Sequence, residues 1–206
     1  MTMKLKSIIT LRLLGVLTLP LFASQLTSCG KSAAAVEGAK FTPQQVADTV
    51  ATVLRADRTV YARDIVTRLK DEGVITAHEE WKSEKKLLLP AQMFRAGAEE
   101  VDKMDNKPVE FSYSLQSLWP LNVENAKKQT PEIKKGLQAI VDNKGETYYG
   151  EEELGGKKFF FAIYPDKAVA KACWQCHNDH ENRKPEYPEF AQGDVMGGVV
   201  IRLPLD

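Results

Sequence analysis

The chain has 206 residues, of which 28 are basic and 28 are acidic, so its formal net charge is zero. This length is enough for one domain with a sizeable hydrophobic core. The balanced charge, without a basic run or patch, argues against nucleic acid as a partner. Beyond a short stretch near the N-terminus, no apolar segment approaches the length of a membrane span, which predicts a soluble domain.

The N-terminus has the pattern of a secretory signal. Three basic residues lie within the first twelve positions, and an apolar run from Leu13 to Ala23 follows, too short to span a membrane. The next segment, Leu26-Thr27-Ser28-Cys29, resembles a bacterial lipobox, in which cleavage leaves the cysteine as a lipidated N-terminus. The alternative is ordinary signal cleavage nearby, with Cys29 incidental. We favour the lipoprotein interpretation because the small-residue site runs directly into a cysteine.

These features predict an exported protein in three parts. Residues 1–28 are the lipoprotein signal peptide, residues 29–40 a flexible tether of small residues, and residues 41–206 the folded domain. Gly30 rather than Asp follows the cysteine, and in Gram-negative lipoproteins this implies sorting to the outer membrane. We therefore expect a domain held by a lipid on Cys29 at the periplasmic side of the outer membrane, with no other membrane contact.

The first half of the domain is predicted to be helical. Thr42-Pro43-Gln44-Gln45 combines an N-cap threonine with proline at the first helical position. Apolar residues then recur at helical spacing as far as Leu69, and Asp71-Glu72-Gly73 ends this long amphipathic helix. An irregular stretch from Val74 to Leu89 follows. A second helix is expected over residues 90–104.

The second half of the domain predicts strands with helices between them. The expected elements, in chain order, are a strand over Val109–Leu115, a helix after Thr130-Pro131, a hairpin with strands Glu146–Glu152 and Lys157–Tyr164 around Gly155-Gly156, a short helix Lys167–Cys176 capped by Asp166, and a last strand Val195–Leu203. This order predicts an α+β fold with an antiparallel sheet and a long N-terminal helix as an extension.

The segment Cys173-Trp174-Gln175-Cys176-His177 has the attachment signature of c-type haem. In that chemistry the two thiols add to the haem vinyl groups and His177 supplies an imidazole to the iron. Two intervening residues in a helical turn set both sulfurs toward one porphyrin edge. Three alternatives are a thioredoxin-like redox pair, a zinc knuckle completed by His180, and a chance match in a cytosolic protein. Predicted export favours haem, because the motif depends on the compartment.

The cysteine count agrees with these assignments. The chain has three cysteines: Cys29 for the lipid, and Cys173 and Cys176 for one covalently bound haem c. None remains for a disulfide, although an exported protein would permit one.

Several segments, taken in order, resemble bacterial c-type haem-binding domains with a PAS-like fold, which occur alone or as the sensory part of receptors. These segments are Leu89-Pro90-Ala91, Pro120-Leu121-Asn122-Val123-Glu124-Asn125, the Cys-x-x-Cys-His motif, and Gly193-Asp194-Val195-Met196-Gly197-Gly198 before Leu203-Pro204-Leu205. The resemblance covers Phe41 to the C-terminus. It implies a haem packed against a PAS-like sheet, with His177 as one axial ligand. Some members use a cysteine of the N-terminal helical region as the second axial ligand, and this chain has no thiol to spare.

The sixth iron position could be open, or it could hold another residue as second axial ligand. The candidates are His78, Met93, Met104, His180 and Met196. His78 is favoured because it stands in a polar segment where no apolar face requires it, and Glu79 or Glu80 could orient its ring. His180 is too close in sequence to the motif to reach the opposite face, and Met93 is the alternative ligand. The competing interpretation of His78 is a solvent-exposed loop histidine.

Three functions follow from these observations, in order of preference. The first is a lipid-tethered monohaem cytochrome that passes single electrons to a redox partner protein or buffers redox state, and is not an enzyme. The second is a haem-based sensor of redox poise or of a diatomic gas, which rests on the fold-level resemblance. The third is a haem enzyme such as a peroxidase, for which the sequence offers no clear distal acid–base residue.

Overall fold

The computed structural model describes residues 40–122, 127 and 129–205, within a compact unit that begins at Lys40. The predictions for residues 1–39, Cys29 included, lie outside the described residues, and so do Val123, Glu124 and Asn125 of the segment from Pro120 to Asn125. Within the described part of the chain, no helix is both long and apolar enough to cross a membrane.

The predicted long helix is present as three consecutive segments, α1 (Pro43–Val60), η1 (Tyr61–Thr67) and α2 (Arg68–Asp71). It begins with a capping box: the Thr42 hydroxyl accepts a hydrogen bond from the Gln45 backbone, and the Gln45 side chain accepts one from the Thr42 backbone. The reciprocal bonds satisfy two free backbone N–H groups at the helix start.

The middle of this helix differs from the expectation of a regular α-helix. Over η1 the backbone is wound as a π-helix, and the hydroxyl of Thr67 donates to the carbonyl of Ala62, five residues earlier, at 2.8 Å. Such wider turns are uncommon and often occur at functional sites. Ala62 is fully buried, so the π segment lies against the rest of the fold.

The sheet has four strands and is antiparallel throughout, in the order β1-β4-β3-β2. Its strands are β1 (Ser112–Gln116), β2 (Tyr148–Leu154), β3 (Lys157–Lys167) and β4 (Val195–Pro204). The predicted hairpin joins β2 to β3, and both Gly155 and Gly156 have positive φ, as a two-residue hairpin turn requires. The first and last strands therefore pair, which confirms the α+β class with an antiparallel sheet.

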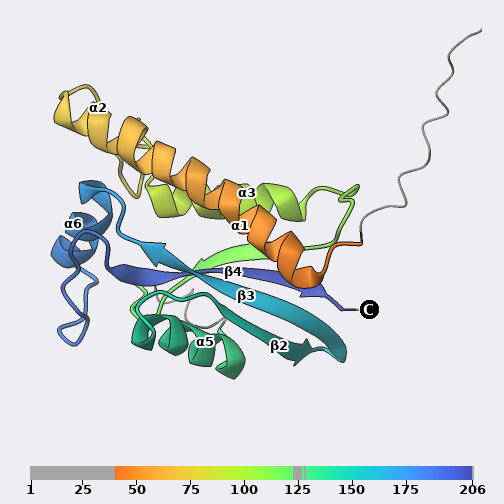
Figure 1. Ribbon diagram of the computed structural model, residues 1–206. Coiled ribbons are helices and arrows are strands. Elements are labelled where there is room, and N and C mark those ends of the chain that lie inside the picture. The colour runs from red at the N-terminus through yellow and green to blue at the C-terminus, as the bar shows by residue number, and fades with distance from the viewer. Residues whose placement is uncertain (1–39, 123–126, 128, 206) are drawn as a thin grey trace, which may run out of the picture. The chain divides into compact units, whose positions relative to one another are not determined.

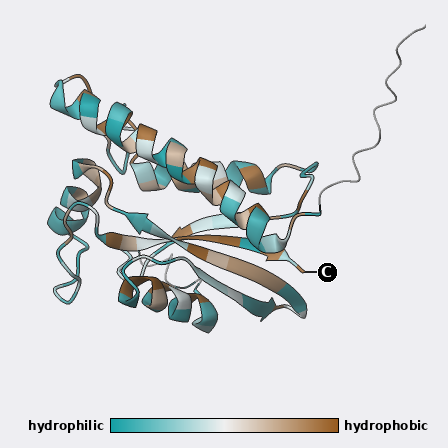
Figure 2. Ribbon diagram, in the orientation of Figure 1, coloured by the Kyte–Doolittle hydropathy of each residue, from teal (hydrophilic) through white to brown (hydrophobic). Residues whose placement is uncertain are grey.

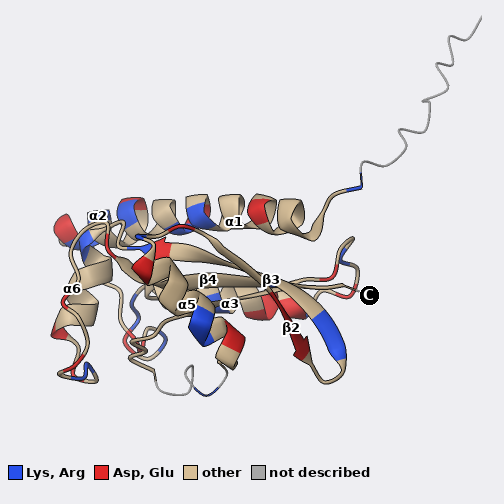
Figure 3. Ribbon diagram, turned by 60° about the horizontal axis from the view of Figure 1, so that its bottom comes forward, with Lys and Arg blue, Asp and Glu red and all other residues tan. Residues whose placement is uncertain are grey.

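Helices cover both faces of the sheet (Figure 1). On one face α1 and α3 (Pro90–Asp102) enclose a core around Phe94, Tyr113 and Ile201. On the other face α5 (Pro131–Asp142) packs a second core against the sheet, centred on Phe161. Between them, β4 and the middle of β3 show apolar residues in Figure 2, whereas β2 is largely hydrophilic. Charged residues of both signs are interspersed along α1 and around the β2–β3 hairpin (Figure 3).

The predicted start of the motif-bearing helix is wrong. Asp166 does not cap it; β3 continues through this residue, which pairs with Gly197 of β4 and is buried. A register shift follows Asp166, and helix α6 begins only at Lys171, with Ala170 at the N-cap. Because Asp166 forms an ion pair with Arg58 of α1, its carboxylate is held by a distant segment rather than by a local helix terminus.

Candidate functional site

Helix α6 (Lys171–Asp179) carries the whole Cys-x-x-Cys-His motif and packs against η1 of the long helix (Figure 1). Cys173 and Cys176 are both free thiols, the first buried and the second partly exposed. Residues three apart lie on one face of an α-helix. The two sulfurs are therefore presented toward the same side of α6, as the spacing predicts.

Cys173 lies in a small apolar cluster that joins α6 to several other parts of the chain. Its buried members are Ala62, Ala168, Ala170, Cys173, Phe190 and Met196, with Trp119, Val169 and Trp174 packed against them. Ala62 belongs to the π-helical segment, so this unusual turn faces the motif. The cluster gives the first cysteine a largely apolar environment.

Cys176 is influenced by charged groups of α2 and of the segment that follows it. Burial raises the pKa of the Cys176 thiol, the nearby Glu79 carboxylate raises it further, and Lys70 acts in the opposite direction. A thiol that attacks disulfides requires a lowered pKa. The environment of Cys176 therefore disfavours a thioredoxin-like function for the motif.

His177 is held as a neutral imidazole. Burial lowers its pKa to about 4, and the positive charges of His180 and Arg58 act in the same direction. Its ring meets the ring of Phe190 edge to face, with 5.8 Å between the centroids. Neutral imidazole is the form that binds a metal, so His177 is ready to act as a ligand near neutral pH.

His78 lies in the segment between α2 and α3 and is exposed. Its backbone N–H donates to the carbonyl of Leu87 at 3.0 Å, and its ring Nδ1 accepts from the backbone N–H of Glu80 at 3.1 Å. With Nδ1 as the acceptor, Nε2 of the neutral ring carries the proton, so ligation through Nε2 would require the proton to move to Nδ1 and the bond from Glu80 to be released. The ring is thus oriented by a backbone amide, and not by a carboxylate as expected from the sequence.

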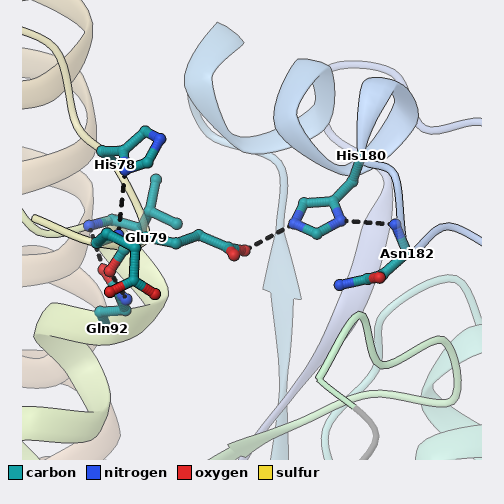
Figure 4. Close-up of polar contacts among 7 residues, drawn as sticks. His78, Glu79, Gln92, His180 and Asn182 are labelled. Atoms are coloured by element: carbon teal, nitrogen blue, oxygen red, sulfur yellow. Dashed lines mark hydrogen bonds and ion pairs between the residues drawn. The ribbon is translucent and has the colours of Figure 1, made fainter.

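Glu79, one of the two carboxylates expected to orient His78, instead contacts His180 at the end of α6. Glu79 Oε1 lies 2.6 Å from Nε2 of His180, whose side chain is 10% exposed (Figure 4). The other ring nitrogen, Nδ1, accepts from the backbone of Asn182 at 3.0 Å, so Nε2 carries the proton and donates to Glu79. This bond connects the segment carrying His78 with the C-terminal end of α6. His180 is therefore engaged away from the motif.

The methionine candidates are placed very differently. Met196 is buried in the cluster around Cys173. Met93 is half-buried on α3, whereas Met104 is 55% exposed beyond the C-terminal end of that helix. The structure thus brings Met196, but not Met104, to the motif.

Arg58 and Asp166 are site residues that the sequence analysis missed. Arg58 is 8% exposed, and its charge acts on His177, so it lies near the motif. One signal was available: Arg58 stands four residues before Ala62 and seven after Ala51, on the buried face of the long helix. A lone arginine on such a face requires a buried partner.

The donor set fits covalent haem better than zinc. Two free thiols on one helical face, a neutral imidazole beside them and apolar neighbours match what haem attachment requires. Among the described residues, no group of three or more His, Cys, Asp or Glu side chains is arranged to hold a metal ion. A zinc knuckle would need four such ligands, and His180 points to Glu79 instead.

Comparisons with known proteins agree with this chemistry. The chain matches no curated protein and no solved structure. The model of the Tll0287-like family matches residues 36–204, which is most of the chain. The chain therefore belongs to the Tll0287-like family, a family of cytochrome-like haem-binding domains.

Proposed function

We propose that this protein is a monohaem c-type cytochrome that transfers single electrons or buffers redox state. The observation that carries the proposal is the presentation of two free thiols on one face of α6 with a neutral imidazole beside them. Cys173 and Cys176 would hold the haem through thioethers, and His177 would bind its iron. When bound, the haem supplies a one-electron redox couple.

The chain's own residues would set the properties of that couple. The cluster around Cys173 excludes water from one side of α6, and exclusion of water and burial both influence a haem potential. The sheet with its first and last strands paired, and with helices on both faces, supports a PAS-like fold. A haem beside such a sheet is compatible with an electron carrier and with a sensor. The two functions differ in whether the second axial position of the iron is filled or open.

We further propose that Cys29 carries a lipid that holds the domain at the periplasmic side of the outer membrane. The support is the signal-like N-terminus that runs into a cysteine. Replacing Cys29 with serine should move the protein from the membrane fraction to the soluble periplasmic fraction, because the acyl chains provide the membrane affinity. The visible spectrum of the haem should not change. A wild-type protein that is already soluble, with its mature N-terminus elsewhere, would contradict the anchor.

We propose His78 as the second axial ligand. Its segment is joined to α6 by the Glu79–His180 bond (Figure 4). The His78 ring would have to release the bond from Glu80, because Nδ1 accepts in it and Nε2 of the neutral ring carries the proton. Ligation would require this exposed ring to turn toward the iron. Two histidine ligands would make the iron low-spin and its potential low, since methionine ligation raises it.

Carbon monoxide separates an electron carrier from a gas sensor or an enzyme. With both axial positions filled, the spectrum of the reduced wild-type protein should not change when the gas is added. His78→Ala should open one position and produce the spectrum of a carbon monoxide complex. Met104→Ala, which removes a ligand candidate that the structure does not bring to the motif, is the control and should remain unreactive.

Two outcomes would change these assignments. Ready binding by the wild type would favour the sensor or the enzyme over the electron carrier. An unreactive His78→Ala protein would exclude His78 as the ligand and direct attention to Met93 or to Met196, which lies beside Cys173.

A further inference from the structure

Arg58 is a buried cation with an incomplete set of partners. Its Nη1 lies 2.6 Å from Oδ1 of Asp166, and both side chains are 10% exposed. Its Nε–H is also buried but has no hydrogen-bond partner among the described residues. A guanidinium presents several N–H donors in a rigid plane, and burying one without an acceptor is unfavourable. The ion pair therefore accounts for only part of this side chain's placement.

Arg58 itself lies near the proposed haem site. The charge of Arg58 acts on His177 and helps to hold its imidazole neutral. Arg58 also precedes, by one helical turn, the Ala62 that packs in the cluster around Cys173. On the opposite side of the pair, the chain continues from Asp166 to Ala168 and Ala170 of the same cluster. Both partners thus belong to the framework of the motif.

A haem brings two carboxylates, its propionates, into such a site. A carboxylate shielded from water needs a cationic hydrogen-bond donor, and arginine suits it because the planar fork matches the two oxygens. We propose that Arg58 binds a haem propionate through its free Nε edge while Asp166 holds the other side of the guanidinium. This inference rests on the proposed function, because it requires covalently bound haem.

The competing explanation is structural. Arg58 and Asp166 join α1 to β3, and an ion pair could serve only that purpose. The two explanations differ in what they predict for the haem. If the pair is only structural, loss of Arg58 would change the stability of the protein alone. If Arg58 binds a propionate, its loss would also change the reduction potential of the haem and the ionisation of that propionate.

The test measures the reduction potential of the haem-loaded protein between pH 5 and 8 by spectroelectrochemistry, together with the propionate bending mode in resonance Raman spectra. Arg58→Gln should lower the potential, because it removes a positive charge that disfavours the oxidised haem. The potential should also become pH-dependent at the acidic end, where the unpaired propionate takes up a proton. Arg58→Lys should restore the potential in part, since it returns the charge without the fork.

Arg55→Gln is the matched control, because Arg55 carries the same charge on the same helix but is exposed. Its potential, pH profile and propionate mode should equal those of the wild type. If Arg58→Gln does not fold, the double variant Arg58→Met with Asp166→Leu replaces the buried pair by apolar side chains, a change that proteins often tolerate. This variant loses one positive and one negative charge, so their effects on the potential largely cancel. A pH-dependent potential and an altered propionate mode would then report loss of the contact between Arg58 and the propionate.

Wild-type potential, pH profile and propionate mode in a folded variant lacking Arg58 would overturn the inference. Failure of the proposed function would give a different result, because the wild-type protein itself would then carry no covalent haem.

Discussion

Replacing both Cys173 and Cys176 with serine is expected to abolish covalent haem attachment completely. The thioether bond requires a sulfur atom that adds to a haem vinyl group, and a serine hydroxyl does not supply one. The protein should be made in a host that has the c-type maturation machinery. After acid–acetone extraction, wild-type protein should keep its colour, and the double variant should yield a colourless polypeptide.

Cys29→Ser is the matched control for this experiment. It makes the same chemical change at the third cysteine, which lies outside α6, and it should leave the haem attached. Haem that extracts freely from the wild-type protein would refute covalent attachment and, with it, the assignment of α6 as the haem-binding helix.

Replacing Phe161 with alanine should lower the free energy of unfolding by about 3–5 kcal/mol, the usual cost of truncating a buried aromatic residue. Phe161 is 1% exposed on β3 and belongs to the core beneath α5. Its ring lies 6.0 Å from that of Tyr148, and a Cβ added at Gly150 would stand 2.7 Å from it. The space around the ring is therefore filled by neighbouring strands, which cannot collapse freely into the cavity.

Urea denaturation, followed by circular dichroism, measures this loss as a lower midpoint with an unchanged slope. Phe41→Ala removes the same side chain at a position that is 69% exposed, and it should change stability by less than about 0.5 kcal/mol. Equal losses in the two variants would mean that the core beneath α5 does not support the fold as described.

Local patterns in the sequence were enough to predict most of the elements. The capping box at Thr42 and the hairpin turn at Gly155 and Gly156 depend on residues within a few positions of one another, and the structure shows both. The Cys-x-x-Cys-His motif is local in the same sense: its spacing alone places both thiols on one face of a helix. Such features can be predicted because their physical cause lies within one or two turns of chain.

The errors concern residues whose partners are distant in the sequence. Aspartate is a common N-cap residue, which is why Asp166 was expected to begin a helix. Pairing of β3 with β4 and the ion pair with Arg58 hold it in the sheet instead. Glu79 was expected to orient its neighbour His78, but it bonds to His180, 101 residues further along the chain. A local pattern does not specify which of several nearby or distant donors a carboxylate will reach.

The sequence by itself determined the fold class and the presence of a helix that bears the motif, and it supplies the prediction that three residues of this helix hold haem. Only the tertiary structure decided what surrounds them: the π-helical turn at Ala62 against Cys173, Met196 in the same cluster, and a buried Arg58 near His177. The reason is that burial and charge are properties of packed segments. A side chain's exposure, and hence the pKa of a group such as His177, is set by residues that only the fold brings together.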